Sequence, residues 1–291
     1  MLAILLALLA GALFGLVGVV ARRAIRAGGS PEVGAFAGTT VGAAVAVIAA
    51  LASGVGPGDV HWHELWPFLA VGVIVPGVAN VLFNLAVRAI GPSRVGVLVG
   101  TVPLLSVLIA MVALDERPDP VLWVGIVLIV AGGAVLAWDK SRPDGYKKIG
   151  VPLALVCAVL FAGRDNVVRW AADGRHPPPL AAASATLIAA AVGAFAYLLV
   201  ARRDTLVAAL LPSYRRFTLP GVCIGAAYIA LVEAFDKGGV SLVAPLNATQ
   251  SLWSMAFAWV LIGRRSEAIG PRLIGAAVLV VAGSIIVGIF R

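Results

Sequence analysis

Three consecutive polar residues interrupt an apolar stretch near the middle of the chain. They are Arg164, Asp165 and Asn166, in LFAGRDNVVRW at residues 160–170. A carboxylate in an apolar site tends to keep a proton, so Asp165 could take up and release protons. Arg164 favours the ionised carboxylate, and Arg169 is a same-face partner that could lock Asp165 in a structural ion pair. We predict Arg164 and Asn166 as solute contacts and Asp165 as a proton-coupling residue, with the structural pair as the alternative.

A second polar group follows Pro245 in the sequence PLNATQSLWS. Asn247 and Gln250 fall on one helical face, with Thr249 and Trp253 to its side. The proline can break a helix and free a backbone carbonyl at the depth where transporters use half-helices. We predict these four polar and aromatic residues as further solute contacts.

Two other apolar stretches carry polar side chains. Asn80 and Asn84 are four residues apart and share a face, where they could bind a polar solute or hydrogen-bond neighbouring helices. Tyr228 is predicted as a solute contact and Glu233 as a second proton-coupling carboxylate. Lys237 could pair with Glu233, which would then be a solvated residue at a helix end.

The composition explains why these polar residues draw attention. The chain has 291 residues, of which 61% are hydrophobic and only 12% charged, against about 25% charged in globular domains. This deficit of charged residues predicts an integral membrane protein. Polar residues inside membrane spans cost free energy, so we treat each of them as a candidate functional residue. The net charge of +8 comes without a basic patch interleaved with aromatics, so we expect no nucleic-acid partner.

Enzyme and metal chemistry find little support in the sequence. We find no GxSxG, P-loop or dinucleotide motif, so no enzymatic activity and no cofactor are expected. His61, His63 and Glu64 are too few and too closely spaced to predict a metal site, and are typical of an interfacial loop beside Trp66.

Ten stretches are long and apolar enough to cross a bilayer, which takes about 20 residues each. They predict an all-α polytopic membrane protein. The stretches lie near 2–21, 32–52, 66–87, 93–114, 120–138, 149–171, 180–200, 217–235, 240–262 and 270–290.

The two halves of the chain are copies of one another. LALLAGALF (6–14) matches LALVCAVLF (153–161) at five of nine positions, and GPSRVGVLVGTVPLLS (91–106) matches GVSLVAPLNATQSLWS (239–254) at seven of sixteen. The offsets, 147 and 148, agree. We therefore predict two five-helix units, 1–143 and 144–291. Because five is odd, the second unit enters the membrane inverted, a common plan of secondary transporters.

The segment IGPSRVGVLVGTVPLLSVLIAMVALDERPDPVLWVGIVLIVAGGAVL (90–136), within this ten-helix plan, resembles the EamA-type branch of the drug/metabolite transporter superfamily. The resemblance covers essentially the whole chain. The family's carboxylate at the end of the fourth helix matches Glu116, and its fifth-helix glycines match Gly125 and Gly133. The second copy departs from the pattern, because Arg264 stands where a glutamate would. The resemblance implies transport of amino acids or related metabolites.

Basic residues are divided unequally between the two sides. Loops between spans 1–2, 3–4, 5–6, 7–8 and 9–10 carry sixteen Lys and Arg, while the opposite side carries five. Basic loops stay cytoplasmic, so we expect both termini outside the cytoplasm, in a cytoplasmic (plasma) membrane. The family resemblance implies the reverse orientation.

Together these features favour a secondary transporter that exports a small polar or amphipathic metabolite by alternating access. The expected partners are the solute, membrane lipid and possible coupling protons, and the chain is expected to act as a monomer or homodimer. Two alternatives stay open. One is a flippase for a lipid-linked sugar or phosphate, with Arg164 as the anion contact, and the other is a non-transporting assembly subunit.

Overall fold

The described part of the chain is built from helices and contains no strand. The computed structural model describes residues 1–114, 121–138, 145–172, 177–201, 206–237, 243, 246–263 and 268–289. The helices are α1 (Leu2–Arg26), α2 (Pro31–Ala52), η1 (Pro57–Asp59), α3 (Trp62–Gly72), η2 (Val73–Val78), α4 (Ala79–Ile90), α5 (Pro92–Val99), α6 (Val102–Leu114), α7 (Leu122–Trp138), α8 (Gly150–Ala172), α9 (Pro179–Ala201), α10 (Leu206–Lys237), α12 (Gln250–Leu261) and α13 (Pro271–Ile289).

Within the described ranges, six helical stretches are long and apolar enough to cross a membrane, as a polytopic membrane protein requires. Two further apolar helices, Trp123–Leu136 and Pro271–Val287, are shorter. The six are Leu2–Arg26, Pro31–Ala52, Trp62–Ile90, Gly150–Val167, Pro179–Ala201 and Leu210–Lys237.

Each of the ten predicted stretches contains helix, but three of them are interrupted. In the third, Val75 is extended (φ −137°, ψ 112°) before Pro76, between α3 and α4. A residue before proline is driven out of helical geometry, which accounts for this break. The fourth stretch divides into α5 and α6, where Pro103 has no N–H to donate to the carbonyl four residues earlier. The ninth contains α12, which begins only at Gln250.

The predicted start of the eighth stretch, residue 217, is too late. Helix α10 already begins at Leu206 and is 32 residues long. Ser213 and Phe217, four residues apart, are both buried, while Leu211 is exposed. The segment before residue 217 is therefore a helix with one buried face and one exposed face. An average of hydropathy over its apolar and polar residues does not detect such a helix.

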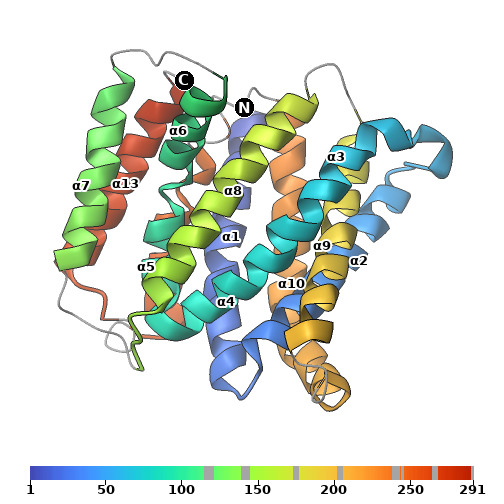
Figure 1. Ribbon diagram of the computed structural model, residues 1–291, viewed down its shortest axis with the longest axis horizontal. Coiled ribbons are helices and arrows are strands. Elements are labelled where there is room, and N and C mark those ends of the chain that lie inside the picture. Colours follow the sequence, from blue (N-terminus) through green and yellow to red (C-terminus); the bar gives the residue numbers. More distant parts are fainter. Residues whose placement is uncertain are drawn as a thin grey trace.

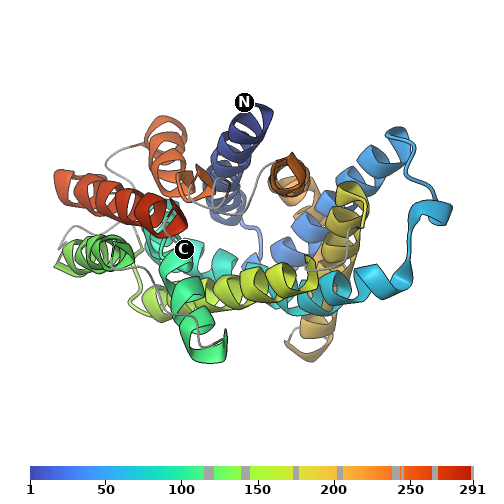
Figure 2. The ribbon, with the colours of Figure 1, turned by 90° about the horizontal axis from the view of Figure 1, so that it is seen from above.

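The helices form an elongated assembly with α1 and α8 crossing its centre (Figures 1 and 2). α7 and α13 lie at one end, and α2, α3 and α9 at the other. α1 and α8 run in opposite directions, and both termini lie at the same end of the helices (Figure 1). α8 packs mainly on α4, α5 and α6, whereas α10 packs on α1, α2 and α9.

Glycines set the closest helix contacts, as small residues do where lipid gives no hydrophobic drive for helices to associate. A Cβ built on Gly15 of α1 would lie 2.7 Å from the Ser254 nitrogen of α12. Likewise, a Cβ on Gly125 of α7 would lie 2.8 Å from the Gly283 oxygen of α13. Both helix pairs can approach this closely only because these positions lack side chains.

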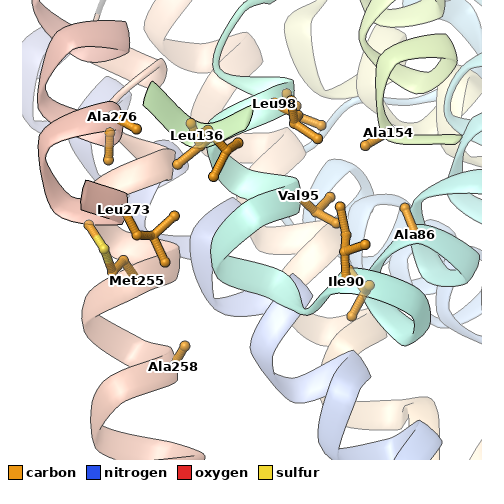
Figure 3. Close-up of a cluster of buried hydrophobic side chains, with 14 of the residues drawn as sticks. Ala86, Ile90, Val95, Leu98, Leu136, Ala154, Met255, Ala258, Leu273 and Ala276 are labelled. Atoms are coloured by element: carbon orange, nitrogen blue, oxygen red, sulfur yellow. The ribbon is translucent and has the colours of Figure 1, made fainter. Parts of the chain in front are cut away.

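The largest buried cluster surrounds α5. Every residue of this helix is buried, and its side chains meet residues of α4, α7, α8, α12 and α13 (Figure 3). Ile90, Val95 and Leu273 are among the side chains at this junction. A fully enclosed short helix gives the break between α5 and α6 a rigid support.

Candidate functional site

Arg164 is the centre of the polar contacts on α8. Its Nε and Nη2 donate to Asp165 Oδ1 at 2.9 and 2.7 Å, and its Nη1 donates to Tyr228 Oη at 3.0 Å. The guanidinium lies 5.3 Å from the centroid of the Phe161 ring and 5.9 Å from that of the Tyr228 ring. The neighbouring residues Arg164 and Asp165 thus pair directly, although their helical positions alone do not require it.

Tyr228 comes from a different group of helices. It lies on α10, which packs with α1, α2 and α9, while Arg164 lies on α8 among α4, α5 and α6. Phe14 of α1 meets the Tyr228 ring edge-on, with centroids 5.5 Å apart. We call Arg164, Asp165 and Tyr228, with the rings of Phe14 and Phe161, the central cluster. It joins the two helix groups through side chains.

The central cluster has a closed side and an open side. The Arg164 side chain is 15% exposed, whereas that of Asp165 is 38% exposed. Tyr228 is buried. The two aromatic rings beside the guanidinium stabilise it through cation–π attraction. Arg164 could therefore bind an anionic ligand, which would compete with the Asp165 carboxylate for its N–H groups.

Two threonines at corresponding positions of the repeated sequence mark helix breaks. Thr101, between α5 and α6, donates to the Leu98 carbonyl at 2.7 Å. Thr249, just before α12, donates to the Leu246 carbonyl at 2.6 Å. Residues 98 and 101 of the first half correspond to 246 and 249 of the second at the offset of 148. The two halves therefore interrupt their helices at matching positions with the same hydrogen bond.

The break before α12 lies at the level of the central cluster along α1. A Cβ on Gly11 would lie 3.1 Å from Thr249 Oγ1 and 3.2 Å from the backbone carbonyl oxygen of Asn247. Phe14, one turn further along α1, contacts Tyr228. Asn247 Oδ1 is buried and has no hydrogen-bond partner in the described part of the chain. Such a buried acceptor is suited to a donor supplied by a ligand.

Serines fasten α12 to the buried helix α5. Ser251 Oγ donates to the Gly96 carbonyl at 2.8 Å, and Ser254 Oγ donates to the Pro92 carbonyl at 2.9 Å. These bonds hold the start of α12 in register with α5, and so fix the position of the Asn247 turn.

The remaining predicted contacts on α8 and α12 are Asn166, Gln250 and Trp253, none of which belongs to the central cluster. Asn166 Nδ2 lies 2.9 Å from Ser106 Oγ and 3.1 Å from the Ser106 carbonyl, so it links α8 to α6. Gln250 is half-buried. Trp253 is 39% exposed and stacks on Phe257 at 5.8 Å.

Three predicted residues lie away from the cluster's contacts. Asn84 is buried and donates to the Pro31 carbonyl at 3.1 Å, which fastens α4 to the start of α2. Asn80 is half-buried on the same helix. Glu233 accepts from Lys237 Nζ at 2.8 Å near the end of α10. Their roles in solute binding and proton coupling stay predictions.

Sequence reasoning missed the two phenylalanines of the cluster. Phe14 and Phe161 occupy equivalent positions in the repeated segments, at the offset of 147. Identity between the two copies was the signal that could have found them. Aromatic residues in an apolar helix otherwise predict only packing.

Some sequence predictions fall outside the described residues. These are Pro245, Glu116, Arg264 and the Arg169 side chain. Within the described ranges, no group of three or more His, Cys, Asp or Glu side chains could hold a metal ion.

Residues 1–138 and 148–289 match the EamA-like transporter family. The chain belongs to this family. As an EamA-like protein with long apolar helices, it is an integral membrane protein of a transporter family, in agreement with the resemblance found in its sequence.

Solved structures share its fold. Fifteen chains match, and one crystal structure covers 99% of this EamA-like chain and 99% of its own, with a TM-score of 0.59 at 20% identity. At this identity the likeness shows the fold alone. No curated protein matches the sequence.

Proposed function

We propose that this EamA-like protein is a secondary transporter that exports a small polar or amphipathic metabolite, amino-acid-like in its chemistry, by alternating access. The observation that carries the proposal is the hydrogen bond from Arg164 to Tyr228, at 3.0 Å. It joins the helix group of α8 to that of α10, so separation of the groups would open the central cluster. Membership of a transporter family supports this proposal.

We further propose ten transmembrane spans in two inverted five-helix units, 1–143 and 144–291. The family match falls into two stretches with a gap at 139–147, close to the proposed junction. The matching breaks at Thr101 and Thr249 support the duplication, as do the opposite directions of α1 and α8 (Figure 1). Two near-equivalent halves could exchange conformations and open the site to either side in turn.

The proposed solute carries an anionic group and a hydrogen-bond donor. Arg164 would bind a carboxylate through its planar set of N–H groups, and the Tyr228 hydroxyl would hold the guanidinium in place. Asn247 Oδ1, buried without a partner among the described residues, would accept from an amino or amide group. An amino acid presents both kinds of group.

Asp165 is the proposed proton-coupling residue. In the present structure Arg164 donates two hydrogen bonds to Oδ1 of this carboxylate. A proton bound to Asp165 would neutralise the carboxylate and weaken these bonds, leaving Arg164 free for the solute anion. When the solute leaves, the proton would leave Asp165 and the ion pair would form again. Proton and solute would thus cross in the same direction, so that export is driven by the outward solute gradient and accelerated when the solute side is the more acidic one.

The proposal is tested by flux measurements in proteoliposomes. A panel of radiolabelled amino acids and related metabolites is loaded inside, and efflux is followed with and without an imposed pH gradient. We expect saturable efflux of at least one solute, faster when the lumen is the more acidic side. Lipid scrambling without solute flux would contradict the proposal in favour of a flippase, and the absence of both would favour an assembly subunit.

A further inference from the structure

A pocket lies at the opposite end of α8 from the central cluster's side chains. It has a volume of about 310 Å³ between the end of α4 and the start of α8. The residues that line it are Leu85, Arg88, Ala89, Gly145, Lys147, Ile149 and Leu153. Both cationic side chains, Arg88 and Lys147, are exposed, and neither has a carboxylate partner among the described residues. The pocket therefore presents two exposed cationic side chains that no part of the transport proposal uses.

The carbonyl groups at the C-terminal end of α4 are already hydrogen-bonded beside this pocket. A helix C-terminus normally presents carbonyl groups with partial negative charge. At α4, Arg22 Nη1 donates to the Val87 carbonyl at 2.7 Å and also to the Arg88 carbonyl. The backbone N–H of Lys147 donates to the Ala89 carbonyl at 2.8 Å. Because these carbonyls already accept hydrogen bonds, they are less available to oppose an anion beside Arg88 and Lys147.

The polarity of the pocket changes along the helices. Arg88 and Lys147 lie at the ends of the spans, whereas Leu85 and Leu153 lie about one turn further in on α4 and α8. Ile149, at the rim, is 59% exposed. A cationic end above an apolar wall matches a phospholipid, whose charged headgroup lies at the interface and whose chains extend into the hydrocarbon. A free inorganic anion would gain nothing from the apolar wall.

We propose that this pocket binds the headgroup of an anionic phospholipid, with Arg88 and Lys147 contacting its phosphate and Leu85, Ile149 and Leu153 contacting its acyl chains. Basic pockets between transmembrane helices are a recognised form of anionic lipid site. The site is separate from the proposed solute site, and does not depend on the transport activity.

The test uses native mass spectrometry of the full-length protein, titrated in detergent with dioleoyl phosphatidylglycerol or dioleoyl phosphatidylcholine. The wild type should bind phosphatidylglycerol more tightly than phosphatidylcholine. A variant carrying Arg88→Gln and Lys147→Gln should lose about fivefold in affinity for each charge removed, or about 25-fold in all. Phosphatidylcholine binding should change little, and an excess of inorganic phosphate should not displace the bound phosphatidylglycerol.

The matched control carries Arg215→Gln and Arg216→Gln, which also removes two exposed charges but outside the pocket. Equal loss in the control, or unchanged binding in the pocket variant, would overturn the proposal in favour of general surface electrostatics. Displacement by phosphate would overturn it in favour of a free-anion site. If the double variant fails to fold, Lys147→Gln alone, at an exposed side chain, should still lower the affinity about fivefold.

Discussion

Arg164 donates three hydrogen bonds to two partners, Asp165 and Tyr228. A guanidinium taken out of water loses much of its hydration, and an ion pair compensates for this only with good geometry and further hydrogen bonds. The Tyr228 hydroxyl and two aromatic rings supply those additional contacts. The arrangement keeps a cation at a depth where an unpaired one would be costly.

Tyr228→Phe removes the hydroxyl but keeps the ring that contacts Phe14 and Arg164. Hydrogen bonds to charged groups contribute about 1.5–3 kcal/mol. If Tyr228 positions Arg164 for the solute, we expect the half-saturating solute concentration to rise at least tenfold, with little change in the maximal rate. Tyr197→Phe, on α9 outside the cluster, is the control and should leave both values unchanged. Flux titrations in proteoliposomes measure them, and an unchanged Tyr228→Phe titration would remove the residue from the site.

At this scale the sequence could predict which residues would matter but not their partners. Arg164, Asp165 and Tyr228 were all predicted as site residues from their polarity within apolar stretches. The direct pairing of Arg164 with Asp165 depends on side-chain rotamers, which helical spacing leaves open. The contact with Tyr228 depends on how α8 and α10 are placed, and no local pattern contains that information.

Among the helices, the close contact of α1 with α12 depends on Gly15. A Cβ on Gly15 would lie only 2.7 Å from the Ser254 backbone nitrogen and 2.8 Å from the Trp253 Cβ of α12, so the missing side chain allows this approach. This contact holds the turn at Asn247 and Thr249 against α1, beside the central cluster.

Gly15→Ala should therefore force α1 and α12 apart. Overpacking of this kind costs about 1–3 kcal/mol, so we expect a lower melting temperature in detergent and weaker solute binding. Gly133→Ala is the matched control, because a Cβ at Gly133 of α7 would meet nothing within 4 Å. Alanine has the higher helix propensity, so the control should melt at the same temperature or slightly above the wild type. Equal melting of both variants would show that the α1–α12 contact is not tight.

Hydropathy located a helix in every predicted stretch but did not resolve the interruptions within them. An apolar window averages over Val75, Pro76 and Thr101, whose effects are local. Pro76 and Pro103 can disturb a helix, yet prolines are tolerated in membrane helices when neighbours satisfy the freed groups. The break at Thr101 became recognisable only beside its counterpart at Thr249.

For the molecule as a whole, the distribution of basic residues bears on the orientation in the membrane. Both termini lie at one end of the helices (Figure 1), as an even number of crossings requires. The exposed basic residues of the described ranges are Arg23, Arg26, Arg88, Lys147, Lys148, Arg215, Arg216, Arg272 and Lys237. Arg215 and Arg216 lie within α10, and Lys237 lies at its end. We propose that the side carrying the first eight of these residues is cytoplasmic.

A cysteine introduced by Lys148→Cys tests this orientation. The native Cys157 and Cys223 are buried, at 0% and 5% exposure, so a membrane-impermeant maleimide should react little with the wild type. We expect Lys148→Cys to be labelled in inside-out vesicles but not in intact cells. Labelling in intact cells would mean that the side carrying these basic residues faces outward.

The most direct test of the transport account compares Asp165→Asn with the wild type in proteoliposomes. Arg164 and Tyr228 remain in this variant, so solute exchange at equal pH should persist, while the acceleration by an imposed pH gradient should be lost. Asp59→Asn, which removes an exposed carboxylate of η1 outside the central cluster, serves as the comparison and should respond to the gradient like the wild type. An Asp165→Asn protein that still responds fully to the pH gradient would contradict the central claim.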